Sequence, residues 1–254
     1  FYDLLTNDRY GLGEFVRPEI VDKWSLYTVA QYCDQLVKSG YKNGDTGEDI
    51  WEPRFTFNGV INSRDDAFFV LQQMSTAWRG MAYWSLGTVF ATADMPQDPV
   101  RIVTPANVRG GEFSYSGTAL KARHSVIVVK WNDPDDFYRP ATELVIDNEA
   151  LQKYGWREKR LQLTGCTSRG LAHRYGKWIL DSEQHETESV TYEASWDHVE
   201  VRPGEIVAIA DPRKAAVRLG GRIVEHRGNT VTLDYDFETV PGAHRKVGRG
   251  IEVG

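Results

Sequence analysis

The chain of 254 residues is 41% hydrophobic and 26% charged, which is typical of a folded protein with one large or two to three small domains. Its 36 acidic and 30 basic residues give a formal net charge of −6, which argues against a broad phosphate-binding surface without excluding a local one. No apolar run approaches the roughly 18 residues that would span a bilayer, and no signal peptide is visible.

The start of the chain and its cysteines indicate its context. The first residue is Phe1 rather than Met, so we expect an excised piece of a longer protein, which leaves an upstream signal open. Cys33 and Cys166 lie 133 positions apart, which argues against a disulfide framework and fits synthesis in a reducing compartment.

Residues 1–52 are predicted to be a helical N-terminal segment. A short helical turn opens residues 1–16, and apolar residues then keep a helical period over 20–38. Ser39 and Gly40 are expected to end this helix, because glycine favours the conformation that follows a last helical turn. Residues 40–53 are polar and Gly-rich, which predicts a loop.

Residues 53–96 are predicted to form a β-α-β-β accessory domain. Alternation over 55–61 indicates a strand, and Ser63 with Asp66 is typical of the start of a helix over 64–79. We expect that helix to bury Phe68, Leu71, Met74, Ser75 and Trp78. Residues 81–86 and 88–93 read as a hairpin around Gly87, and two prolines within 94–99 predict a domain boundary.

Residues 97–165 are predicted to be a β-rich segment. Strands are expected over 113–117, 123–131 and 141–146, with a turn at 132–136. The second strand carries a continuous apolar run from Val126 to Val129, which is typical of a strand buried on both faces.

Residues 166–254 are predicted to be a helix followed by a small β-barrel. A short hydroxyl at Thr167 or Ser168 can cap a helix over 168–187, which we expect to pack on a sheet. The expected apolar stripe of this helix is Leu171, Tyr175, Trp178, Ile179 and Ser182. Short strands over 190–196, 204–210, 221–225 and 230–234 suggest a barrel or sandwich, and 241–254 an edge or linker. The fold class is therefore α+β, with several β-rich domains and a few amphipathic helices.

The residues give no catalytic, cofactor-binding or metal-binding constellation. His185-Glu186 begins like a zinc-protease motif, but Ser189 stands where the second histidine belongs. The histidines at 124, 173, 185, 198, 226 and 244 are scattered, so we expect surface or satisfied core positions rather than ligands.

Three weaker patterns are better read as structural. Cys166 and His173 lie seven positions apart, too far on a helix for a direct hydrogen bond, so Cys166 is expected to be a buried thiol. Gly165 and Gly170 bracket a stretch without the Gly-Lys-Ser/Thr of a phosphate loop and are expected to serve turn geometry. The aspartates at 133, 135 and 136 lack calcium-loop spacing. A carboxylate pair for glycoside hydrolysis stays open, because 36 acidic residues give no basis for choosing two.

Several segments resemble the tail tip attachment proteins of lambda-like siphophages, the host-specificity protein J family, in its N-terminal to central hub region. The residues that carry the resemblance are Tyr2-Asp3-Leu4-Leu5, Arg9-Tyr10-Gly11-Leu12-Gly13, Asp22-Lys23-Trp24, Gln31-Tyr32-Cys33-Asp34-Gln35, Ala119-Leu120-Lys121-Ala122-Arg123-His124, Trp131-Asn132-Asp133-Pro134, Ala141-Thr142-Glu143-Leu144-Val145, Gly165-Cys166-Thr167-Ser168-Arg169-Gly170, Ala172-His173-Arg174, Pro203-Gly204 and Gly220-Gly221-Arg222. They occur in the same order along nearly the whole chain. Residues 40–53, 81–93 and 236–254 match poorly.

The resemblance implies a structural protein of the virion, assembled in the host cytoplasm. Such proteins form a homotrimeric hub, baseplate-hub-like, that closes the tail tube, contacts other tail tip and tail tube proteins, and lets DNA pass without specific binding. Small β-barrel domains related to the tail-tube subunit build the hub. The host outer-membrane receptor would be reached through segments outside this chain.

Two alternatives stay open beside this reading. One is a carbohydrate- or receptor-binding module that uses an exposed aromatic residue such as Trp51, Trp156 or Trp196. The other is a cell-wall-degrading hub enzyme, for which no catalytic residues can be named. We expect no enzyme activity and no cofactor.

Overall fold

The computed structural model describes residues 1–61, 66–214, 223–227, 230–233 and 250–252, the last three ranges by backbone only. The chain separates into two compact units. Unit 1 comprises residues 1–97 and 115–189, and unit 2 comprises residues 98–114 and 190–254.

The described residues form both helices and strands. The helices are α1 (Tyr2–Thr6), α2 (Lys23–Asp34), α3 (Ala67–Thr76), α4 (Asn148–Tyr154) and α5 (Arg169–His185), with 3-10 turns η1 (Pro18–Ile20), η2 (Leu120–Ala122), η3 (Pro134–Asp136) and η4 (Trp196–His198). The strands are β1 (Leu36–Lys42), β2 (Asp49–Pro53), β3 (Gly80–Ser85), β4 (Thr88–Ala93), β5 (Arg101–Val103), β6 (Val108–Gly117), β7 (Val126–Asp133), β8 (Arg139–Ile146), β9 (Glu158–Gln162), β10 (Glu188–Ala194), β11 (Val207–Ile209), β12 (Ile223–Arg227), β13 (Thr230–Leu233) and β14 (Gly250–Glu252).

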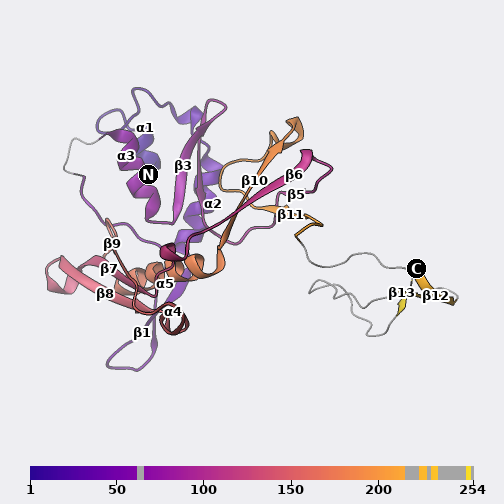
Figure 1. Cartoon of the computed structure of the whole chain (residues 1–254). Coiled ribbons are helices and arrows are strands. Elements are labelled where there is room, and N and C mark those ends of the chain that lie inside the picture. Colours follow the sequence, from indigo (N-terminus) through magenta and orange to yellow (C-terminus); the bar gives the residue numbers. More distant parts are fainter. Residues whose placement is uncertain (62–65, 215–222, 228–229, 234–249, 253–254) are drawn as a thin grey trace. The chain divides into compact units, whose positions relative to one another are not determined.

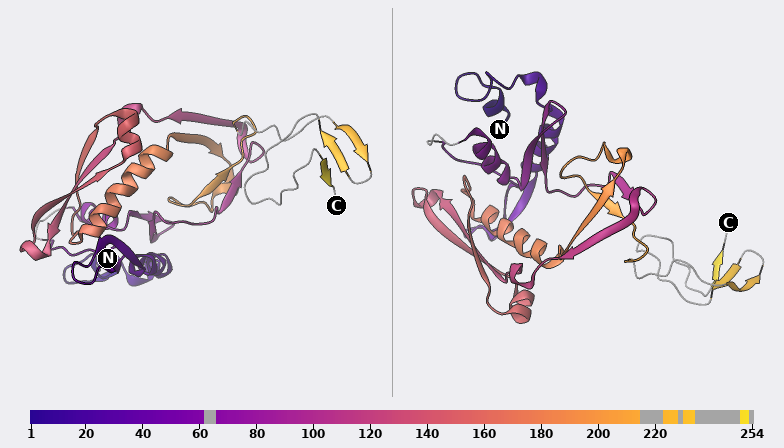
Figure 2. Two further views of the ribbon diagram at one scale, coloured as in Figure 1. Left: turned by 90° about the horizontal axis from the view of Figure 1, so that it is seen from below. Right: turned by 45° about the horizontal axis from the view of Figure 1, so that its top comes forward.

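Helix α5 forms where the sequence predicts it, and it covers a three-stranded sheet in unit 1 (Figures 1 and 2). Ser168 Oγ accepts the Leu171 N–H at 3.1 Å and caps the helix. The sheet has the order β8-β7-β9, with β7 antiparallel to β8 and parallel to β9. Helix α5 contributes the buried apolar side chains of Leu171, Ala172 and Leu180 to the core between the helix and the sheet.

The strand predicted to be buried, β7, is the centre of this core. Val126, Ile127 and Val129 are fully buried, and Trp131 is nearly so. Phe55, Val145, Leu163 and Cys166 complete the same cluster from other parts of unit 1. The helix can approach β7 and β8 closely because Gly176 has no side chain where the two elements cross.

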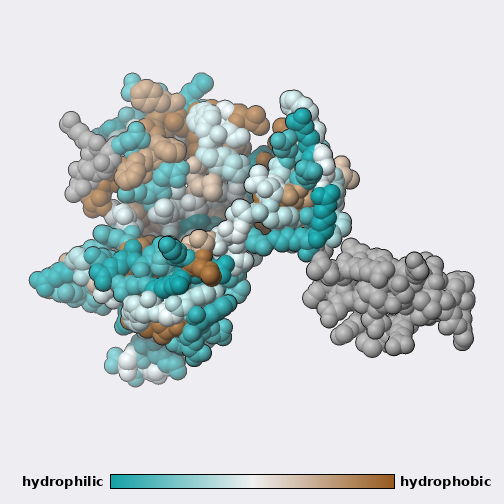
Figure 3. All heavy atoms as spheres, viewed as in Figure 1, coloured by the Kyte–Doolittle hydropathy of each residue, from teal (hydrophilic) through white to brown (hydrophobic). Residues whose placement is uncertain are grey.

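A second, smaller core in unit 1 joins the start of the chain to a hairpin. Leu5, Val16, Val21 and Val89 pack together there. The hairpin pairs β3 with β4 antiparallel, as predicted, and its turn at Leu86 and Gly87 has positive φ at both residues, 51° and 78°. This backbone twist is typical of two-residue hairpin turns. Figure 3 shows apolar surface gathered over the α1–α3 region and a mostly hydrophilic surface over β7–β9.

Unit 2 is built from small sheets. Strands β5 and β11 pair in parallel, β6 pairs with β10, and β12, β13 and β14 form an antiparallel sheet. Its buried hydrophobic side chains, among the described residues, are Val103 and Val108. No sheet formed by the described residues closes into a barrel. The α+β class is therefore confirmed, whereas the barrel is not.

The prediction from sequence is wrong for the segment between residues 35 and 61. Helix α2 ends at Asp34, and residues predicted as helix end and loop instead form the hairpin β1–β2. Residues 55–61, predicted as a strand, form no strand, and two of their amides bond outside any sheet, to the last turn of α2 and to the turn at Gly165. The Phe55 N–H donates to Cys33 O at 3.2 Å, and the Asn58 N–H to Gly165 O at 2.8 Å.

Other elements also differ from expectation. Helix α3 is shorter than predicted and is capped by Asp66, whose Oδ1 accepts the Phe68 N–H at 2.9 Å. Phe68 itself is exposed, although the pattern predicted burial, while Ser75 is buried as expected. Helix α4 and strand β9 were not predicted. Ser63 and most of 241–254 lie outside the described residues. None of the helices in the described part of the chain is both long and apolar enough for a membrane span.

Candidate functional site

A buried carboxylate, Glu143, gathers polar groups at the start of α5. Its side chain lies on β8 with Val145 on the same inward face, and the residue is only 5% exposed. Oε1 accepts hydrogen bonds from the Tyr41 hydroxyl (2.6 Å) and His173 Nδ1 (3.0 Å), and Oε2 accepts one from Arg169 Nε (2.7 Å). A buried carboxylate is tolerated because its lone pairs are satisfied in this way.

The pKa values in this cluster follow from the contacts. Burial acts to raise the pKa of Glu143, but the hydrogen bonds from Tyr41, Arg169 and His173 outweigh it, so the pKa lies below its ordinary value. Burial, followed by the hydrogen bond to Glu143, raises the pKa of Tyr41 to about 12. The Arg169 guanidinium also lies 4.4 Å from the centre of the Tyr41 ring. The carboxylate is therefore held ionised and the phenol neutral.

A second carboxylate, Glu52 of β2, binds the same end of α5. Its Oε2 accepts the Ser168 hydroxyl at 2.5 Å, and its Oε1 pairs with the Arg174 guanidinium. Arg174 also donates to Arg54 O at 3.0 Å. Glu52 therefore connects β2, and Glu143 connects β8, to the first two turns of α5.

Two glycines of the Gly-Cys-Thr-Ser-Arg-Gly stretch have different roles. Gly165 adopts a φ of +71°, and a Cβ there would meet the Phe57 ring at 2.6 Å, so its turn role is confirmed. Gly170 is helical, and a Cβ there would lie 2.3 Å from Glu52 Oε1 and 2.8 Å from Ser39 O. Gly170 therefore allows β1 and β2 to approach the helix.

The Cys166 thiol, which lies between these two glycines in the sequence, is buried and unreactive. Cys166 is 3% exposed, its Sγ donates to Ser168 O at 3.3 Å, and burial raises its pKa to about 11. A thiol nucleophile needs a lowered pKa and access to substrate, so Cys166 is a packing residue. Both cysteines are free.

The histidines within the part described with side chains each have a local partner. His124 bonds Glu183 at 2.8 Å, His173 bonds Glu143, and His185 bonds Asp181 O at 2.8 Å. His198 bonds Asp197 at 3.0 Å. The side chain of His226 and the whole of His244 lie outside that part. Among the described residues no group of three or more His, Cys, Asp or Glu side chains is placed to hold a metal ion.

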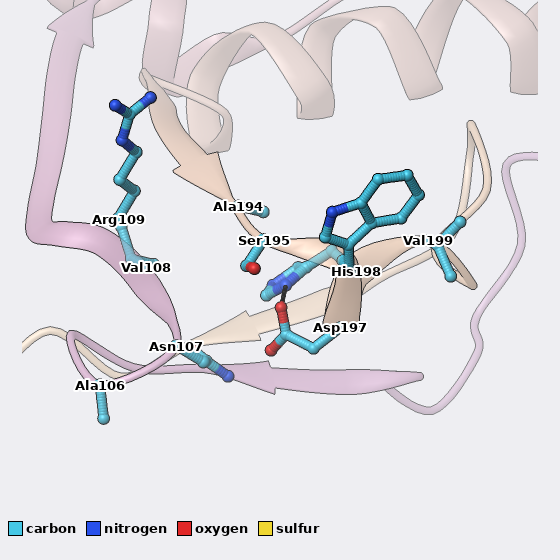
Figure 4. Close-up of a pocket in the computed structure, with 10 residues that line it drawn as sticks. Ala106, Asn107, Val108, Arg109, Ala194, Ser195, Asp197, His198 and Val199 are labelled. Carbon is cyan, nitrogen blue, oxygen red and sulfur yellow. Dashed lines mark hydrogen bonds and ion pairs between the residues drawn. The ribbon is translucent and has the colours of Figure 1, made fainter.

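Unit 2 has an open depression of about 930 Å³ between residues 106–109, which lead into β6, and residues 194–199, which follow β10 (Figure 4). Several of its polar groups are engaged within the unit. Asn107 accepts the Thr104 N–H (2.7 Å) and donates to Ile102 O (3.1 Å), Asp197 pairs with His198, and Arg109 pairs with Glu193 at 3.2 Å. Two apolar side chains at its edge are exposed, Trp196 at 87% and Val199 at 68%.

This depression lacks the geometry of a nucleophilic active site. Asp197 and His198 form a pair, but His198 Nε2 is buried without a hydrogen-bond partner, and Ser195 contacts His198 through its backbone carbonyl. A serine nucleophile would need its hydroxyl on that nitrogen.

Sequence reasoning did not single out either carboxylate. Glu143 could have been found, because it alternates with Val145 on the buried face of a predicted strand. Glu52 gives no such signal, because its partners Ser168 and Arg174 lie 116 and 122 positions away. The three aromatic candidates that the sequence suggests, Trp51, Trp156 and Trp196, are all exposed.

The family of the chain follows from comparison with known proteins. Residues 66–225 match the family described as "Putative phage tail protein", and the chain belongs to this family. The curated relatives include two called "Tip attachment protein J". The one from Escherichia phage SECphi27 is 32% identical over 244 residues, and the one from Escherichia phage SECphi4 is 31% identical over 241 residues. The expected resemblance to tail tip attachment proteins is confirmed.

The matches cover very different shares of this chain and of its relatives. They cover 95% and 94% of this chain, but the chain spans only a fifth of the length of each relative. Among solved structures, the 43 kDa tail protein of prophage MuSo2 from Shewanella oneidensis has a TM-score of 0.37 at 16% identity, covering 68% of this chain and 53% of that one. The prophage tail protein gp18 of Listeria monocytogenes has 0.34 at 11%, covering 73% and 60%. These TM-scores are too low to define a common fold.

Proposed function

We propose that this chain is a structural segment of a phage tail tip hub, which closes the tail tube, organises the tip and links it to receptor-binding domains for host attachment and DNA delivery. The observation that carries the proposal is the similarity to tail tip attachment proteins over 95% of the chain. The engaged polar groups support it too, because Glu143 and Glu52 are fully used in holding elements together.

The proposed hub is a homotrimer within the virion, assembled in the host cytoplasm. Copies of the chain would pack against one another and against other tail tip and tail tube proteins, and the receptor would be bound by segments outside the chain. Trp196 and Val199 support an interface role, since large exposed apolar side chains are typical anchors of protein contacts. In the assembled hub, the back-half strands would complete a small tail-tube-like barrel, and DNA would pass without specific binding. The four-segment domain organisation remains a prediction.

Light scattering after size exclusion, over a wide concentration range, tests this proposal. A mass of three chains is expected, and Trp196→Ala should lower that mass toward one chain at the same concentration. Trp156→Ala is the matched control, because Trp156 is also exposed but lies in unit 1. A chain that stays monomeric at every concentration, and also in the presence of tail tube protein, would contradict the trimer.

A carbohydrate-binding module is the second candidate, because Trp196 lies exposed at the edge of the unit 2 depression. Exposed aromatic rings stack on sugars, but Asn107 and the Asp197 carboxylate beside this one are already hydrogen-bonded within the unit. Binding on a glycan array that Trp196→Ala abolishes would favour this function. Release of soluble fragments from purified peptidoglycan would instead favour the cell-wall-degrading alternative.

A further inference from the structure

The hairpin of residues 36–53, called the strap here, turns its polar side toward the body of unit 1. It contributes no buried hydrophobic side chain, and its one buried residue is Ser39. Leu36, Ile50 and Trp51 are its large exposed hydrophobic residues. Hydrophobic burial, which holds most elements in place, is therefore a minor term for the strap.

Charged hydrogen bonds hold the strap instead. Tyr41 of β1 donates to Glu143, and Glu52 of β2 accepts from Ser168 and Arg174. The contact is tight because Gly170 lets Ser39 and Glu52 lie against α5. Groups of this kind can exchange their partners for water when the strap leaves, so the loss on opening is far smaller than for an apolar surface.

The base of the strap closes on itself. The Arg54 N–H donates to Gln35 O at 2.8 Å and the Phe55 N–H donates to Cys33 O at 3.2 Å, just outside the two strands. Phe55 is anchored in the main core. The chain can therefore pivot at residues 35 and 54 while the core below stays packed.

We propose that the strap is a conformational device that opens from α5 as one piece while the rest of unit 1 stays folded. Glu52 is its main latch, and Tyr41 on Glu143 is the second. Once released, a lone two-stranded hairpin is only marginally stable in water, so its backbone amides become open to solvent. This inference goes beyond the proposed function and does not depend on it, because the isolated chain is sufficient for its test.

Hydrogen exchange followed by mass spectrometry on the whole chain tests the strap. Peptides covering β1 and β2 should exchange faster than those covering β7, whose side chains form the core. Glu52→Gln should raise exchange in the strap about tenfold, as expected for loss of a charged hydrogen bond, and leave β7 unchanged. Glu158→Gln is the matched control, because Glu158 also pairs with an arginine, Arg160, but does not touch the strap.

A second variant tests the contact by shape instead of charge. Gly170→Ala places a methyl where Glu52 and Ser39 lie, so it should also speed exchange in the strap and not in β7. Raising the ionic strength from about 0.05 to about 0.5 M should act in the same direction, since salt screens the latch. Strap amides that exchange as slowly as β7, or that change with β7 by one common factor in both variants, would overturn the proposal.

Discussion

The close crossing of α5 over the sheet predicts that Gly176→Ala destabilises the chain. On an open helix surface this change would stabilise by about 1 kcal/mol, because alanine has the higher helix propensity. Here the new Cβ would lie 2.8 Å from Val145 Cγ2 and 3.1 Å from Val129 Cγ2. Both valines are buried, at 4% and 0% exposure, so neither methyl can move aside freely.

Overpacking a core of this kind costs roughly 1–3 kcal/mol, and the short contacts place Gly176→Ala in the upper half of that range. After the helix gain is subtracted, we expect a net loss of about 1–2 kcal/mol in the free energy of unfolding. For a domain of this size each kcal/mol lowers Tm by about 2–4 °C, so Tm should fall by roughly 4 °C. Thermal unfolding followed by far-UV circular dichroism measures this.

Two further variants separate the clash from other effects. Gly44→Ala is the matched control, because a Cβ there meets nothing within 4 Å and it should leave Tm unchanged or slightly higher. Val145→Ala makes room for the new methyl, so the double variant with Gly176→Ala should lose about 1 kcal/mol less than the sum of the single variants. An unchanged or higher Tm for Gly176→Ala, or strict additivity, would refute the crossing geometry.

Three other outcomes follow from contacts described above. Leu86 has positive φ and is 94% exposed, so Leu86→Asn should stabilise by about 0.5–1 kcal/mol in urea unfolding, and a loss would contradict the turn assignment. The pKa of Glu143 is lower in the folded state than in the unfolded state, so its contribution to stability is full above about pH 4.3 and is lost as the pH falls through the folded-state pKa. Glu143→Gln should flatten the acid limb of the stability curve, and an unaltered limb would exclude Glu143 as its source. Cys166 should react with a thiol reagent at pH 8 only on unfolding, because a pKa of about 11 leaves about one thiol in a thousand ionised; rapid labelling of Cys166 in the folded chain would contradict its burial.

The elements that the sequence predicted correctly carry their signals locally. Ser168 and the stripe from Leu171 to Ile179 are enough to define α5, and the apolar run at Val126–Val129 is enough to define β7. The β3–β4 hairpin was predictable from Gly87 between two short runs. In each case propensity, hydrophobic period and turn chemistry agree within about twenty residues.

The strap and its carboxylates could not be predicted because their order depends on distant partners. Leu36 and Val37 fit the end of a helix as well as a strand, and only pairing with residues 52 and 53 of β2 decides between them. Glu52 becomes an anchor only when α5 is brought against it. Long-range pairing of this kind overrides local propensity.

The two-segment composition of unit 2 affects how the chain folds. Strand β5 pairs with β11 although Val103 and Ile209 lie 106 positions apart, and most of the residues between them belong to unit 1. The Thr118 N–H and hydroxyl both donate to Thr187 O, at 2.9 and 3.2 Å. These bonds connect the two ends of the segment that contains β7, β8, β9 and α5. If that segment folds first, the loop that β5 and β11 must close shrinks about threefold, which lowers the entropic cost of closure by roughly 1 kcal/mol. During synthesis β5 leaves the ribosome long before β11, so it stays unpaired until β11 has been made. Folding of the intervening segment shortens the loop that their pairing has to close.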